Sequence, residues 1–125
     1  MTTASGFPAD VPPIPQPAST PEDLRAALAA LVPEALGTFD AERAVALRQA
    51  REQVSAAPMR RFVGQWALQV AIERHPERAA RLRFLEARAA TLDDLEEARA
   101  VAAEIGAIID VARIEAGIEH GQGPL

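Results

Sequence analysis

Cysteine is absent from the sequence, which excludes disulfide bonds, thiolate catalysis and zinc sites built on cysteine. Histidine is scarce: His75 and His120 lie far apart and lack the i, i+4 spacing of a helical pair of metal ligands. The period-2 alternation of a strand is missing as well, so no glycine-rich loop follows a strand to bind phosphate. We therefore expect neither a metal nor another cofactor, and no enzymatic activity.

Long hydrophobic runs and a basic leader are also missing. No apolar stretch approaches the roughly 20 residues that a transmembrane helix requires, and the first residues do not resemble a secretory signal. We therefore expect a cytoplasmic protein with no membrane association. Lysine is absent too, because all 13 basic residues are arginine. Together with the abundant alanine, this choice indicates the codon bias of a high-GC genome.

Proline is concentrated at the N-terminus, where residues 1–20 hold five of the ten prolines. Because proline fixes φ and removes a backbone donor, we expect a disordered Pro-rich tail there. The apolar residues that follow recur with helical spacing. The sequence thus predicts an all-α fold, a small bundle of about four to five helices over residues 21–120, with a frayed C-terminus at 121–125.

Start and stop signals divide this region into helices. Thr20 and Pro21 supply a cap and a favourable first position, and acidic residues follow in the first turn. The segment beginning at Thr91 shows a similar signature, so we expect Thr91 to cap the last helix. The predicted helices cover residues 21–32, 38–54, 58–75, 76–90 and about 91–118.

The helix expected from Pro58 to His75 is the centre of the predicted fold. It carries the only tryptophan, Trp66, and it is apolar on two sides, which is typical of a helix surrounded by others. Trp66 is therefore predicted to be a core residue. Gly64 costs this helix about 1 kcal/mol relative to alanine. We interpret it as a point where a neighbouring helix comes close.

Charge is unevenly distributed along a chain whose net charge is −5. Residues 60–90 carry seven Arg and three Glu, whereas residues 91–125 carry two Arg and eight acidic residues. The simplest interpretation is that basic and acidic helices pack beside each other. Arg60 and Arg61 fall near the start of the central helix, where the helix dipole disfavours exposed cations by about 0.3–1 kcal/mol. An acidic group of the chain or of a partner should face them.

The last predicted helix carries a second candidate for a contact surface. Val111, Ile114 and Ile118 form an apolar stripe on a face that is otherwise polar. Exposed apolar stripes of this kind often contact a partner. We therefore expect a non-enzymatic interaction or regulatory protein that binds a protein partner or its own copy through these residues, Arg60 and Arg61. One concrete form is antitoxin-like, with the acidic segment masking a basic partner.

A DNA-binding regulator is the alternative. The helices on either side of His75-Pro76 would then form a helix-turn-helix unit, with four arginines of residues 74–88 facing nucleic acid. The net negative charge and the tight His-Pro junction argue against this interpretation. The arginines concerned are Arg74, Arg78, Arg81 and Arg88.

A set of residues between Thr20 and about Leu85 also carries a family resemblance. These residues are Pro21, Leu24-Arg25-Ala26-Ala27-Leu28, Pro33-Glu34, Phe39-Asp40, Ala46-Leu47, Phe62 and Trp66. In this pattern the chain resembles a family of short, uncharacterised helical proteins from high-GC Gram-positive bacteria, whose domain has no known function. The resemblance implies no particular activity. In size alone these proteins are similar to antitoxins of toxin–antitoxin pairs, an analogy that carries no function by itself.

Overall fold

The computed structural model describes residues 14–118, and within this range the chain is helical with no strand. The all-α prediction is confirmed, while the expected C-terminal fraying at 121–125 lies outside the described residues. No helix in the described part is long and apolar enough to cross a membrane. The helices are α1 (Pro21–Leu31), α2 (Leu36–Gln53), α3 (Ala57–Glu73), α4 (Pro76–Ala89) and α5 (Leu95–Glu115), with a short 3₁₀ turn, η2 (Pro33–Ala35), before α2.

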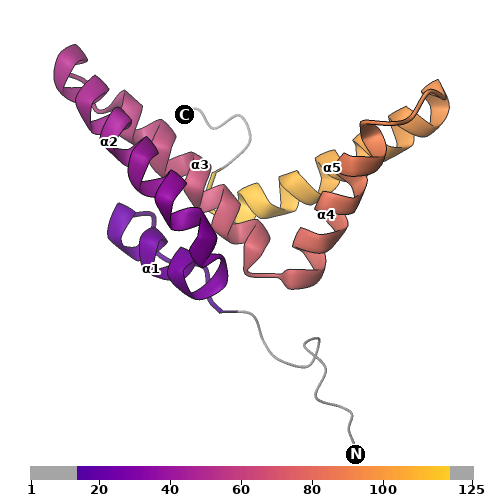
Figure 1. Ribbon diagram of the computed structural model, residues 1–125, viewed down its shortest axis with the longest axis horizontal. Helices are drawn as coiled ribbons and strands as arrows, with labels where there is room; N and C mark the ends of the chain where they lie inside the picture. The colour runs from indigo at the N-terminus through magenta and orange to yellow at the C-terminus, as the bar shows by residue number, and fades with distance from the viewer. Residues whose placement is uncertain (1–13, 119–125) are drawn as a thin grey trace, which may run out of the picture.

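Helix α3 is the axis of the molecule, as the sequence predicts. It contacts α1, α2, α4 and α5, whereas no contact joins α1 or α2 to α4 or α5. Figure 1 shows the consequence: the α2–α3 hairpin and the α4–α5 hairpin diverge like the arms of a V and meet near the C-terminal half of α3. Hollows lie between α3 and α5 and among α3, α4 and α5.

The main core lies where α1 and α2 cover α3. Phe39 of α2 is fully buried, and its ring lies 5.0 Å from that of Phe62 and 5.3 Å from that of Trp66, in an edge-on arrangement with the indole. Edge-on aromatic contacts of this kind are favourable. The Trp66 Nε1 donates a hydrogen bond to the Glu42 carboxylate at 2.9 Å. Trp66 is 7% exposed, so its predicted place in the core is confirmed.

The two predicted caps have different outcomes. The Thr20 hydroxyl accepts the N–H of Asp23 at 3.1 Å and caps α1 as expected. The prediction for Thr91 is wrong, because Asp94 caps α5 by accepting the N–H of Glu97 at 2.8 Å. Thr91 instead donates its hydroxyl to the carbonyl of Arg88 at 3.1 Å, at the end of α4. Thr and Asp are both common capping residues. The connection between α4 and α5 contains both, so Thr91 bonds to the end of α4 while Asp94 caps the start of α5.

The last part of the Pro-rich segment, residues 14–20, is not helical but lies against the helical domain. The Gln16 Nε2 donates to the carbonyl of Ala67 at 3.0 Å, and the Arg74 Nη1 donates to the carbonyl of Ile14 at 2.9 Å. Residues 14–20, which were expected to belong to a disordered tail, are therefore attached by these two hydrogen bonds to α3 and the residue that follows it. Residues 1–13 lie outside the described part of the chain.

Candidate interaction site

The 13 arginines fall into two groups. Seven of them form ion pairs with carboxylates of the described chain. The other six have no such partner among residues 14–118. The unpaired six are Arg48, Arg51, Arg60, Arg61, Arg99 and Arg113.

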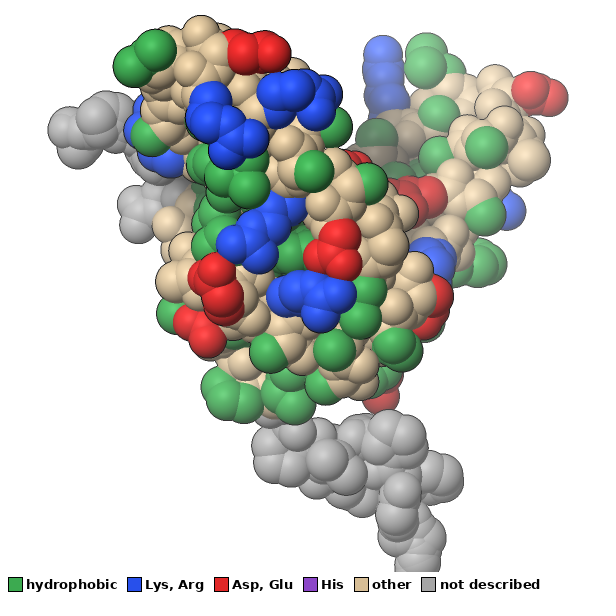
Figure 2. Space-filling view, turned by 60° about the vertical axis from the view of Figure 1, so that its left-hand side comes forward, with side chains coloured by type: hydrophobic (Ala, Val, Ile, Leu, Met, Phe, Trp, Pro, Cys, Tyr) green, Lys and Arg blue, Asp and Glu red, His purple; other side chains and the backbone are tan. Residues whose placement is uncertain are grey.

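Two pairs join α1 to α2. Arg25 holds Asp40 through two hydrogen bonds at 2.8 and 2.7 Å, and Arg43 reaches Glu22 at 2.9 Å. Figure 2 looks onto the side of the molecule where α1 and α2 lie in Figure 1; basic and acidic side chains adjoin in its lower half, and several basic side chains gather near its top. The hydrogen bond from Arg25 lowers the pKa of Asp40, so this pair is charged at neutral pH.

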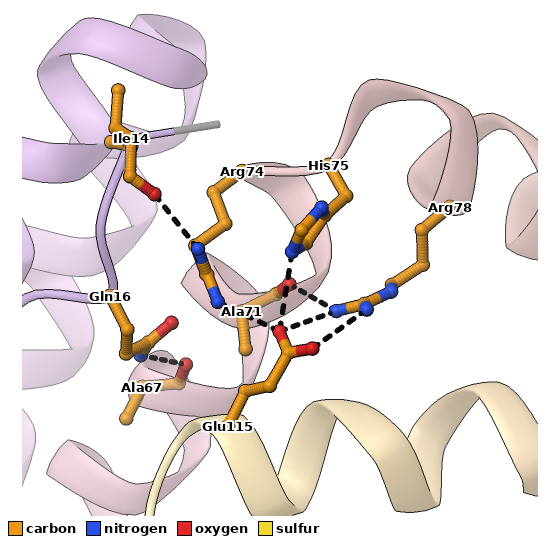
Figure 3. A network of polar contacts seen from close by, with 8 residues as sticks. All are labelled: Ile14, Gln16, Ala67, Ala71, Arg74, His75, Arg78 and Glu115. Carbon is orange, nitrogen blue, oxygen red and sulfur yellow. Dashed lines mark hydrogen bonds and ion pairs between the residues drawn. The ribbon is translucent and has the colours of Figure 1, made fainter. Parts of the chain in front are cut away.

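The first two arginines proposed for nucleic acid, Arg74 and Arg78, converge on Glu115 of α5 (Figure 3). Arg78 holds the carboxylate through two hydrogen bonds at 2.8 and 2.9 Å, and Arg74 adds one at 2.9 Å. Arg78 also donates to the carbonyl of Ala71 at 2.9 Å. The His75 Nε2 lies 3.3 Å from the Glu115 carboxylate but makes no hydrogen bond within the described part of the chain.

This cluster joins α3, α4 and α5 at a single carboxylate. The hydrogen bonds from Arg78, reinforced by the charges of Arg78, Arg74 and His75, lower the pKa of Glu115 to about 2 against the opposing effect of partial burial. Charge-assisted, bidentate hydrogen bonds are the strong kind. We therefore assign Arg74 and Arg78 a structural role at the junction of the two arms.

The other two nucleic-acid candidates connect α4 to α5. Arg81 forms a bidentate pair with Glu104 at 2.7 and 2.8 Å, and Arg88 reaches Glu97 at 3.2 Å. Both pairs are solvent-exposed, so each contributes little to stability, but each directs a guanidinium toward its own chain. The interpretation that the basic and acidic helices pack beside each other is confirmed by these pairs.

Arg60 and Arg61, in contrast, border a groove between the first half of α3 and the end of α5. The groove has a volume of about 490 Å³, and Arg113 of α5 stands on its opposite side. None of the three arginines has a carboxylate partner among residues 14–118, so the rim is basic. The residues that line the groove are Arg60, Arg61, Gly64, Gln65, Leu68, Arg113, Gly117 and Ile118.

Ile118 reaches this groove because α5 ends in a reversal. Gly117 has a positive φ of 81°, a conformation that glycine adopts without strain. The N–H of Ile118 bonds to the carbonyl of Arg113 at 2.8 Å, and the N–H of Gly117 bonds to that of Ile114 at 3.0 Å. This pair of bonds is a Schellman motif. It directs Ile118 toward α3, where it packs against the main core.

The apolar stripe expected on the last helix is therefore divided. Val111 and Ile114 are 47% and 71% exposed, whereas Ile118 is half-buried in the groove. The expectation that all three share one face fails at Ile118, because helical geometry does not continue through the glycine. Of the predicted partner-binding residues, the structure brings together Arg60, Arg61 and Ile118 and leaves the other two on a different side of α5.

Sequence reasoning missed two contributors to the groove, Arg113 and Gly117. Arg113 lies in the last turn of α5, where the helix dipole favours a cation, so it has an ordinary local explanation. Gly117 was the available signal, since a glycine just past a helix end predicts a left-handed residue and a reversal of the chain. No group of three potential metal ligands occurs in the part of the chain that the structure describes.

The sequence was compared with known protein families, curated proteins and solved structures. Neither the curated proteins nor the solved structures contain a significant match to the chain. One family pattern, described as a family of unknown function (DUF6247), matches residues 12–110. The match includes the attached segment before α1, helices α1–α4 and most of α5, and it ends before Arg113. Since it covers most of the sequence, the chain belongs to the family of unknown function DUF6247.

Proposed function

We propose that this chain is a non-enzymatic, cytoplasmic interaction protein that binds a protein partner in the groove between α3 and α5. The observation that supports this proposal is the distribution of the arginines. Those on α4 are held by carboxylates of the chain, whereas Arg60, Arg61 and Arg113 surround an apolar floor without any described acidic partner. Arginine beside an apolar pocket is a frequent centre of binding energy in protein interfaces.

The positive charge at the groove rim indicates an acidic partner. In the antitoxin-like form of the hypothesis, the acidic segment of α5 masks a basic protein. Three of its carboxylates, those of Glu97, Glu104 and Glu115, are already paired with arginines of the same chain. Masking a basic partner through these three carboxylates would break their pairs, so the antitoxin-like form has less support than recognition of an acidic surface.

The DNA-binding alternative meets a similar obstacle. Arg74, Arg78, Arg81 and Arg88 each have a carboxylate partner, and contact with phosphate would require each to exchange it. The net charge of −5 also opposes association with a polyanion. A protein partner therefore remains the better supported function.

Paired charge reversals test the proposal. The variant Arg60→Glu with Arg61→Glu should lose partners captured from a high-GC Gram-positive host, the source that the family resemblance implies. The variant Arg48→Glu with Arg51→Glu is the matched control, because it changes the same charge at exposed, unpaired arginines that do not line the groove. Quantitative mass spectrometry of affinity-captured proteins is the measurement, and circular dichroism checks that both variants fold. Equal capture by wild type and the groove variant would contradict the proposal.

The exposed pair Val111 and Ile114 supports a second, weaker contact, self-association. Ile114 is 71% exposed, and an aspartate there would leave the buried face of α5 unchanged. If two copies meet through this pair, the mass measured by static light scattering should fall from dimer to monomer in Ile114→Asp. An unchanged mass would remove the pair as a self-association surface.

A further inference from the structure

A second hollow continues the groove along α3. It has a volume of about 360 Å³ and lies among α3, α4 and α5. Leu68 lines both hollows, so they adjoin at this residue. The residues of this hollow that matter for binding are Leu68, Ile72, Glu73, Arg83, Glu86 and Ile109.

The joined hollows follow one line of side chains on each of two helices. On α3 the line includes Arg61, Gly64, Leu68 and Ile72, spaced by three or four residues. From the first to the last of these positions, a helix rises about 16 Å, or roughly three turns. On α5, Ile109 and Arg113 are also four residues apart. This length matches about three turns of a helix lying along the trough.

The two ends of the trough differ in charge. Arg60, Arg61 and Arg113 stand at one end without a described acidic partner. At the other end, Glu73 and Glu86 lie with a single arginine, which reaches Glu73 at 3.5 Å. The apolar residues Leu68, Ile72 and Ile109 lie between these ends. A matching ligand is therefore apolar along its length and acidic at one end.

Resting on the proposed function, we propose that the occupant of this trough is an amphipathic helix of the protein partner. It is about three turns long, lays its apolar stripe over Leu68 and Ile109, and places acidic side chains against Arg60, Arg61 and Arg113. A nucleic acid would meet carboxylates at the far end. Charge therefore disfavours a polyanion, and the experiment distinguishes a second copy of this chain from the helical partner.

The experiment uses the full chain and two synthetic peptides. Both are amphipathic helices with the same leucine stripe, one with a cluster of glutamates at one end and the other with lysines there. Each peptide is titrated into isotope-labelled protein while amide signals are followed by NMR. The acidic peptide should shift the signals of Gly64, Leu68 and Arg113, and the basic peptide should not. Arg60→Glu with Arg61→Glu should raise the dissociation constant by at least about tenfold, while Arg48→Glu with Arg51→Glu should leave it near wild type.

The alternative occupants give distinct results. Contacts between the groove and residues 119–125 in the free protein, shifts caused by dilution of a dimer, or shifts caused by duplex DNA instead of the peptide would each overturn the proposal. If the acidic peptide fails while partner capture still depends on Arg60 and Arg61, the helical occupant is wrong and the proposed function stands. If capture is also independent of these arginines, both are wrong.

Discussion

Glu115 is the residue on which the junction of the two helical arms depends. Its folded-state pKa, about 2, lies below the ordinary value of 4.5, so the carboxylate contributes stability above about pH 4.5. That contribution, about 2–3 kcal/mol, should disappear as the pH falls from about 5 to about 2, since protonation then becomes equal in both states. Urea unfolding of wild type and Glu115→Gln across this range measures it: the difference should be largest near neutral pH and vanish in acid.

Glu104→Gln is the control for this prediction. Glu104 also accepts two hydrogen bonds from an arginine, which lower its pKa, but its pair is exposed to solvent. Solvent screening leaves such pairs with little net effect, so this variant should change the free energy of unfolding much less. A pH-independent difference for Glu115→Gln, or an equal loss in both variants, would contradict the assigned role.

Core residues were predictable from the sequence, whereas residue pairs were not. The 3.6-residue period identifies Phe62, Trp66 and Val70 as buried because burial on a helix depends only on which face turns inward. The contact between Arg74 and Glu115 joins residues 41 positions apart. It depends on where α5 crosses α3, and nothing local in the sequence encodes that crossing. For the same reason, the nucleic-acid candidates could not be recognised as internally paired.

At the scale of elements, helix limits followed from local signals. Prolines and caps act within one turn, so the predicted starts of α1, α3 and α4 agree with the structure to about one residue. The end of α5 was harder to predict, because one left-handed glycine redirects Ile118 and thereby creates the groove. Two of the three rim arginines, Arg60 and Arg61, could be predicted from the sequence. Arg113 could not, because it becomes part of the site only when α5 packs on α3.

Gly64 has more space than the sequence suggested. A Cβ built there meets only the Ile118 Cδ1, at 3.9 Å, which is an ordinary contact. The expectation of a close helix approach is therefore wrong. Gly64→Ala should raise the free energy of unfolding by up to about 1 kcal/mol, as the helix propensity of alanine implies. The same gain is expected for Gly106→Ala on α5, where nothing lies within 4 Å of the added methyl group.

The comparison of these two variants separates stability from binding. Gly64 lines the groove and Gly106 does not. Only Gly64→Ala should therefore lower the affinity for the acidic peptide, because the added methyl group fills part of the groove floor. Thermal unfolding and peptide titration of both proteins are the measurements. A destabilised Gly64→Ala would show that the helices cannot accommodate the methyl group, and equal peptide affinity in both variants would place the ligand elsewhere.

At the scale of the whole molecule, the two arms differ in how they are stabilised. The arm formed by α2 and α3 lies on the main core together with α1. The outer part of the α4–α5 arm projects away from it (Figure 1), and its buried residues Leu85 and Val101 do not belong to the main core. They lie on facing helices between the ion pairs of Arg81 and Arg88. A small separate cluster of this kind provides less protection against local opening.

This arrangement predicts two levels of amide hydrogen exchange. Amides in the outer parts of α4 and α5 should exchange through local opening at a lower free energy than amides of α3, which should require global unfolding. Leu85→Ala should lower the free energy of amide exchange mainly in the outer arm. Leu28→Ala, at a fully buried position in the main core, should lower this free energy in all helices by about 2–5 kcal/mol. Hydrogen exchange followed by NMR distinguishes the two variants. An equal, uniform loss in both would mean that the arms unfold as one cooperative unit and would contradict this prediction.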